Sequence, residues 1–99
     1  MTLGDLIGRM GDPDVADEAI GTIRDAALLR RVSTAAAAAH LQIHEYVASS
    51  VRIFANGAED EAWITLIARC QAHSDPGIAA LTYMLESRLR ADEAHVRPD

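Results

Sequence analysis

The strongest structural signal in the chain is the stretch TAAAAAHLQIHEYVASSVRIFAN, which spans Thr34 to Asn56. At about 100° of rotation per residue, it predicts one long α-helix whose polar side chains gather in a stripe roughly 80° wide. A helix that is apolar around the rest of its circumference must be covered on several sides, either by its own chain or by a second copy. The polar stripe consists of Thr34, Gln42, Glu45, Ser49, Arg52 and Asn56, and Ser50 is the one other polar side chain in the second half.

Start and stop signals divide the rest of the chain into further helices. Asp12-Pro13 and Asp75-Pro76 each place an N-capping aspartate before a proline at the first helical position. Asn56-Gly57 is a pair typical of a helix end. The apolar face of the helix that begins at Pro13 loses its phase near Arg30. We therefore expect that helix to bend or end between residues 28 and 33.

These signals predict an all-α fold. It is a small helical bundle of four main helices plus a short N-terminal helix, with the long helix of about residues 34–56 at its centre. No segment shows the sustained alternation of apolar and polar residues that marks a half-buried strand. A chain of 99 residues has no room for a second core of any size. We assign residues 1–95 to a single helical domain and residues 96–99 to a C-terminal tail.

The charge balance argues against several kinds of partner. The chain carries nine arginines, no lysine and a formal net charge of −6, whereas nucleic-acid binding needs a basic face. No apolar run approaches the roughly 20 residues that span a bilayer. The single cysteine, Cys70, cannot form an internal disulfide. We therefore expect a soluble, cytoplasmic protein that binds neither nucleic acid nor membrane.

The thin core favours self-association. Apolar residues make up 49% of the chain, but nineteen of them are alanine, which contributes little free energy on burial. Small chains with thin cores often recover stability by forming oligomers, so we expect a homodimer. Tryptophan and tyrosine often dominate interface energetics, and an apolar arc needs cover. The expected partner contacts are Ala37, Tyr46, Val51 and Trp63.

His40 and His44 give the sharpest chemical hypothesis. Two imidazoles at positions i and i+4 of one helix can bind one metal ion, such as zinc or another transition metal. A helical hairpin could bring His73 or Cys70 of the following helix close enough to serve as a third ligand. The chain lacks a His-Glu-x-x-His motif, so two other interpretations stay open. The pair could be hydrogen-bonded at a helix or subunit boundary, or could form a pH-sensitive interface.

No catalytic set appears in the sequence. There is no dinucleotide or calcium loop and no Ser/His/Asp order, and Cys70 is expected to be a buried structural thiol. These observations favour a small acidic, non-enzymatic adaptor or regulatory protein without a cofactor. It would act through protein–protein contacts, chiefly with a second copy of itself and secondly with another protein. The alternative is a metal- or cofactor-binding helical bundle that uses His40 and His44.

Overall fold

The computed structural model describes residues 2–95, which form six α-helices and no strand. This confirms the all-α prediction, whereas the predicted C-terminal tail, residues 96–99, lies outside the described residues. Among the described helices, none is long and apolar enough to cross a membrane. The helices are α1 (Leu3–Arg9), α2 (Pro13–Thr22), α3 (Ala26–Ala38), α4 (Ile43–Gly57), α5 (Asp60–Gln71) and α6 (Pro76–His95).

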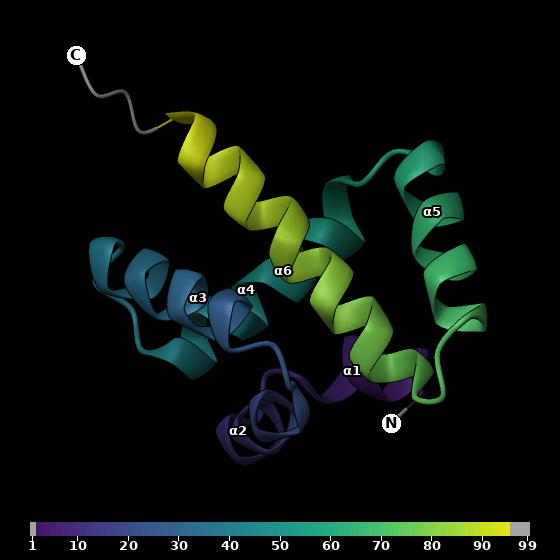
Figure 1. Cartoon of the computed structure of the whole chain (residues 1–99), viewed down its shortest axis with the longest axis horizontal. Helices are drawn as coiled ribbons and strands as arrows, with labels where there is room; N and C mark the ends of the chain where they lie inside the picture. Colours follow the sequence, from purple (N-terminus) through teal and green to yellow (C-terminus); the bar gives the residue numbers. More distant parts are fainter. Residues whose placement is uncertain (1, 96–99) are drawn as a thin grey trace.

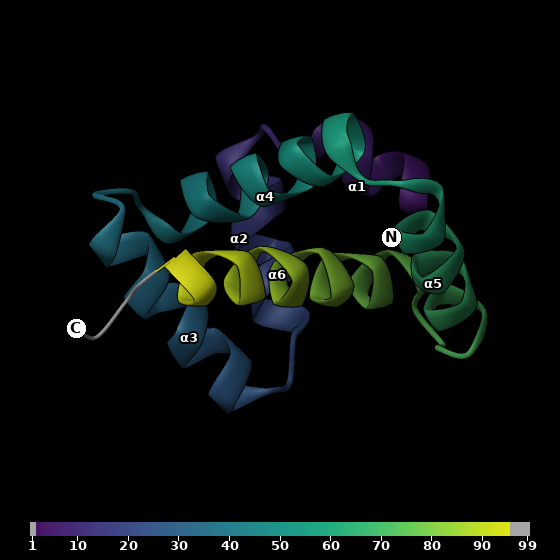
Figure 2. The same cartoon turned by 90° about the horizontal axis from the view of Figure 1, so that it is seen from above.

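The central helix of the bundle is α6. It packs against α1, α3, α4 and α5 (Figure 1), and in Figure 2 it runs between α4 on one side and α3 on the other. A helix in contact with four neighbours must be apolar around most of its surface, and the first half of α6 meets this requirement. Its buried residues there are Ile78, Ala79, Ala80, Leu81, Tyr83, Met84 and Leu85.

The predicted long helix over residues 34–56 is wrong, because the chain breaks it into α3 and α4. At the break His40 has a φ of 59°, the left-handed conformation that ends many helices. Its N–H donates to the carbonyl of Ala37 at 3.1 Å, and the N–H of Leu41 donates to the carbonyl of Ala36 at 2.9 Å. This pair of hydrogen bonds is a Schellman motif, which satisfies the carbonyl groups at the end of α3.

α4 then begins with a capping interaction of its own. The backbone N–H of Gln42 donates to Oε1 of Glu45 at 2.8 Å. Each of the two helices has one buried face, so neither has to be covered on all sides. The apolar arc of residues 34–56 therefore does not by itself require a second copy of the chain. α3 buries Leu28, Val32 and Ala36, and α4 buries Tyr46, Val47, Ser50, Val51 and Phe54.

The helix that begins at Pro13 ends earlier than predicted. α2 stops at Thr22, and Asp25 caps the start of α3 by accepting the N–H of Leu28 on its Oδ1 at 3.0 Å. Residues 28–33, where we expected the end, lie inside α3. The predicted helix starts at Asp12-Pro13 and Asp75-Pro76 are confirmed.

Replacing His40 with glycine should raise the free energy of unfolding by about 0.5 kcal/mol, because glycine adopts a positive φ without a steric cost. Ala37→Gly, at an exposed position within α3, is the matched control. It should lower the free energy of unfolding by about 0.5–1 kcal/mol. Urea unfolding measures both values. In a continuous helix both substitutions would destabilise the protein, so a loss with His40→Gly would contradict the break.

Candidate functional site

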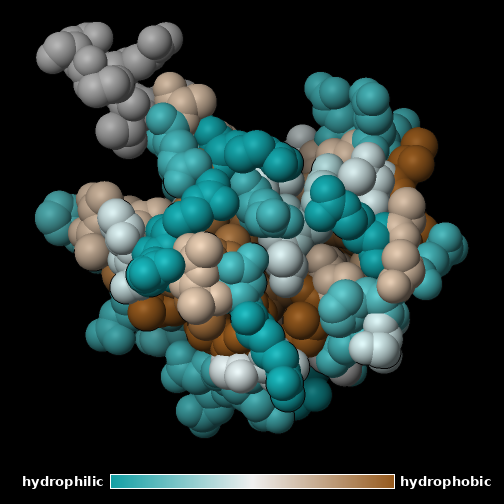
Figure 3. All heavy atoms as spheres, viewed as in Figure 1, coloured by the Kyte–Doolittle hydropathy of each residue, from teal (hydrophilic) through white to brown (hydrophobic). Residues whose placement is uncertain are grey.

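An open groove of about 890 Å³ lies between α3 and the C-terminal half of α6. Its α3 side follows one stripe of that helix, because Ala27, Arg31, Thr34 and Ala38 are spaced by three or four residues. In Figure 3, hydrophilic side chains along α6 border more apolar ones that lie toward α3. This groove is the candidate site. It is lined by Ala27, Arg30, Arg31, Thr34, Ala35, Ala38, Ala39, Arg88, Asp92 and Glu93.

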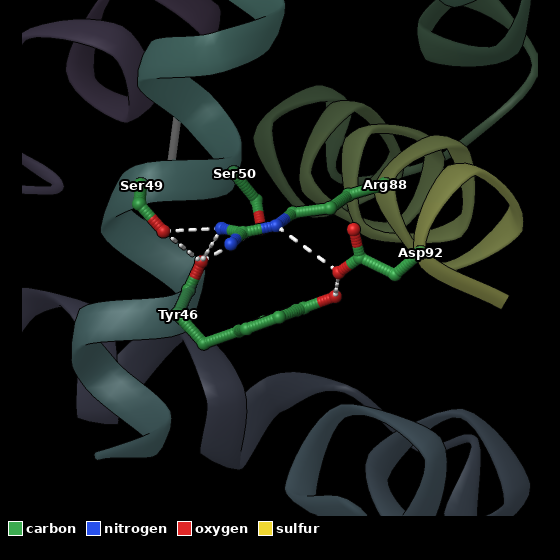
Figure 4. A network of polar contacts seen from close by, with 5 residues as sticks. All are labelled: Tyr46, Ser49, Ser50, Arg88 and Asp92. Carbon is green, nitrogen blue, oxygen red and sulfur yellow. Dashed lines mark hydrogen bonds and ion pairs between the residues drawn. The ribbon is translucent and has the colours of Figure 1, made fainter. Parts of the chain in front are cut away.

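Arg88 anchors the α6 side of the groove to α4 (Figure 4). The carbon of its guanidinium lies 4.0 Å from the centre of the Tyr46 ring. Its Nη1 donates to the backbone carbonyl of Tyr46 and to the hydroxyl of Ser50, both at 3.2 Å, and also to the hydroxyl of Ser49. The Arg88 side chain is only 15% exposed, so these contacts replace the water that a buried cation loses.

Asp92 closes this network one turn further along α6. Its Oδ2 accepts the phenol of Tyr46 at 2.7 Å and lies 3.5 Å from Nε of Arg88. Burial of the phenol and its hydrogen bond to Asp92 raise the pKa of Tyr46 above the ordinary value, because both favour the neutral form. Tyr46 therefore stays a neutral donor that ties α4 to α6 beside the groove.

The two sides of the groove carry opposite charges. α3 contributes Arg30 and Arg31 and has no acidic residue, whereas α6 contributes Asp92 and Glu93 beside Arg88, which is paired with Asp92. Arg31 donates to Glu93 through Nε at 3.1 Å and Nη2 at 2.7 Å, and these bonds lower the pKa of the Glu93 carboxyl. Solvent screens this exposed pair. Arg30 has no ion pair with any other residue in the range 2–95.

The structure separates the predicted metal ligands. His40 is exposed in the turn between α3 and α4, while His44 is half-buried in the first turn of α4, so the two do not share one helix. Cys70 and His73 lie at the C-terminal end of α5. In Figures 1 and 2 that end is on the opposite side of the molecule from the α3–α4 turn. The i, i+4 geometry behind the zinc hypothesis is therefore wrong, and no three His, Cys, Asp or Glu side chains within the described chain are placed to hold an ion.

Cys70 and His73 take part in local hydrogen bonds between α5 and α6. The thiol of Cys70 donates to the carbonyl of Pro76 at 3.3 Å, and burial raises the pKa of that thiol. A raised pKa disfavours the thiolate that a nucleophile or a metal ligand requires. Nδ1 of His73 accepts the N–H of Asp75 at 3.0 Å. Both side chains thus stabilise the connection that leads into α6.

The predicted partner contacts divide into core and surface residues. Tyr46 and Val51 are 0% and 2% exposed, so their side chains serve the core and offer a partner no surface in this conformation. Ala37 is exposed on α3, next to the groove residue Ala38. Trp63 is half-buried, with its ring centre 4.9 Å from that of Phe54.

Helix periodicity in the sequence did not point to the charged residues of the groove. Arg88 stands directly before Leu89, a residue of the apolar stripe of α6, and an arginine beside such a stripe could have signalled a buried cation. The pair Arg88 and Asp92 also has the i, i+4 spacing of a helical ion pair. Contact between Arg88 and Tyr46, however, joins residues 42 positions apart, which helix spacing cannot reveal.

Comparison of the chain with protein-family models, with curated proteins and with solved structures finds no match.

Removing the Tyr46 hydroxyl with Tyr46→Phe should lower the free energy of unfolding by about 1 kcal/mol at neutral pH. The pKa of Tyr46 is higher in the folded chain than the unfolded value of about 10. Above that pH the wild type loses stability, because Tyr46 ionises in the unfolded state before it does in the folded state. The phenylalanine variant has no hydroxyl at this position and does not lose this stability. The difference between the two proteins should therefore shrink by up to about 1.4 kcal/mol per pH unit above pH 10. Urea unfolding at neutral and alkaline pH measures it, and a constant difference would contradict the shift.

Replacing Arg88 with methionine should destabilise the protein by about 2–3 kcal/mol. The change removes the stacking on Tyr46 and leaves buried oxygens of α4 without their donor. Arg90→Met is the matched control, because Arg90 is an exposed arginine two residues after Arg88 in the same helix. It should change stability by less than about 0.5 kcal/mol. Thermal unfolding of both variants provides the measurement. Equal effects would show that the contacts of Arg88 add no more stability than those of an exposed arginine.

Proposed function

We propose that this protein is a small non-enzymatic adaptor that works as a homodimer, in which the α3–α6 groove of each copy receives α3 of the other. The observation that carries the proposal is the groove itself. It is an open channel of about 890 Å³ that is lined by four alanines, a threonine and five charged side chains. The α3 side carries cations alone, and the α6 side carries two carboxylates beside Arg88. A groove between two helices is a common place for a further helix to dock.

The charges favour a second copy as the occupant. A two-fold axis brings one surface patch against the same patch of the partner, so the patch must be complementary to itself. A groove with cations on its α3 side and carboxylates on its α6 side meets this condition, because the α3 side of one copy faces the α6 side of the other. In such a dimer, Arg30 shares Glu93 of the other copy with that copy's Arg31, whereas Arg30 has no ion pair within residues 2–95.

The shape of α3 supports the same arrangement. Its outward residues are mostly small, and small side chains allow two helices to approach closely. The helix has 13 residues, which gives a length of roughly 20 Å for the contact. A contact of this size lies at the low end for specific interfaces, so we expect a dissociation constant in the micromolar range.

Other parts of the sequence-based hypothesis have less support. A cytoplasmic location stays part of the proposal, on the ground that the single cysteine cannot form an internal disulfide. The metal-binding alternative is not proposed, because nothing in the described part of the chain favours it.

A charge-swap experiment tests the dimer. Arg30→Glu and Glu93→Arg should each give a monomer when purified alone, because each creates like-charged pairs across the axis. A mixture of the two variants should form a heterodimer, in which both pairs again have opposite charges. Sedimentation or light scattering measures the mass, and high salt should weaken the wild-type dimer.

Arg52→Glu, at an exposed cation on α4 outside the groove, is the matched control and should leave the dimer intact. A monomeric wild type at high concentration would overturn the proposal. So would a dimer that Arg30→Glu leaves unchanged.

A further inference from the structure

A second surface lies on the outer side of α5. Ile64 and Ile67 are 67% and 46% exposed, although the opposite side of the same helix buries Leu66 and Cys70. Helical spacing places Ala68 beside these two isoleucines and the half-buried Trp63 one turn before Ile67. Brown side chains also reach the outer edge of the molecule over α5 in Figure 3. We name Trp63, Ile64, Ile67 and Ala68 the α5 patch.

Within residues 2–95, Trp63 of the α5 patch packs partly on Phe54, whereas Ile64 and Ile67 stay largely uncovered. α5 packs mainly on α6, and Figures 1 and 2 show it at one end of the molecule with no helix on its outer side. Single exposed apolar residues are ordinary, but two isoleucines on one helical stripe next to a tryptophan form a contiguous patch. Such patches, when they have a polar border, mark contacts with other proteins.

The border of the α5 patch is acidic. Glu59 at the N-cap of α5 and Asp60 and Glu61 in its first turn are all exposed, where the helix dipole favours negative charge. Asp60 lies one turn before Ile64 on the same stripe. Within residues 2–95, none of these three carboxylates has an ion pair. The negative charge of this border is therefore available to a partner.

The one arginine of α5 is already engaged on another side of the helix. Arg69 lies 3.6 Å from Glu86 and stacks 5.3 Å above the ring of Tyr83, both on α6. The apolar α5 patch thus lies beside a border of carboxylates that have no ion pair within residues 2–95. A partner that fits it must supply both apolar area and cations.

We propose that the α5 patch binds an amphipathic helix of another protein, with apolar side chains on one face flanked by lysine or arginine. Ile64 and Ile67 lie on one helical stripe with Asp60, so a helix laid along α5 meets a carboxylate and then two apolar side chains. A second copy of α5 would bring its own three carboxylates to the contact, whereas a basic helix neutralises them. The inference goes beyond the proposed dimer, because a dimer formed through the groove leaves the α5 patch of each copy free.

Fluorescence anisotropy with two labelled peptides tests this inference. One is a synthetic amphipathic helix of leucine and lysine, and the other has glutamate in place of every lysine. The lysine peptide should bind, and the glutamate peptide should bind at least about tenfold more weakly. Ile64→Ser should lower the affinity for the lysine peptide about tenfold. Asp60→Asn should lower the affinity for the lysine peptide several-fold and make that affinity less dependent on salt.

Two matched variants control for general effects. Ile53→Ser changes an isoleucine of α4 that is 56% exposed, and Asp17→Asn changes an exposed carboxylate of α2; both should leave the affinity within about twofold. Arg30→Glu should also bind the peptide normally, so failure of the dimer leaves this result unchanged. Equal affinity for the two peptides, or no effect of Ile64→Ser, would overturn the inference. Conversion of a dimer to a monomer by Ile64→Ser would also overturn it, because the patch would then belong to a second copy.

Discussion

The stacking of the Arg88 guanidinium on the Tyr46 ring is the contact on which the rest of the structure depends. α6 lies at the centre of the bundle, and this contact fixes where its C-terminal half rests on α4. Arg88 and Asp92 both hold Tyr46 and both line the groove. The same side chains therefore belong to the core and to the surface, and the geometry of the groove follows from the packing beneath it.

Local sequence signals predicted the helices well where an unambiguous cap was present, as at Asp12-Pro13 and Asp75-Pro76. They failed at the two breaks for identifiable reasons. Residues 35–39 are all alanine, so they offer no polar side chain whose position could show which face is inside. The break that follows uses His40 where glycine is usual and Gln42 where serine, threonine, aspartate or asparagine is usual. Asp25 is a usable capping signal, but Ala26 and Ala27 continue the apolar face of the preceding helix past it.

The candidate site was less predictable than the fold. The alanine-rich character of α3 was visible in the sequence, and Ala37 is indeed exposed on it. The opposite charges across the groove, however, come from residues such as Arg31 and Glu93, which are 62 positions apart. Whether such residues meet depends on the path of α6 across the bundle, and that path is set by long-range packing. For His40 and His44, in contrast, the sequence spacing predicted a shared helix face that the structure lacks. The left-handed conformation of His40 ends α3 before the two residues can lie on one helix.

The central place of α6 has a consequence for how the chain acquires its structure. α1, α3, α4 and α5 all pack on a helix that follows them in the sequence, and Leu6 of α1 becomes fully buried. Until α6 has been synthesised, α1, α2 and α3 can pack only on α4, and the helix that four of the five earlier helices contact is missing. Helices this short are marginal in isolation. Folding therefore cannot finish while the ribosome is still making the first three quarters of this domain. Contacts between the first helix and the last also raise the contact order, which slows the final step relative to other small helical proteins.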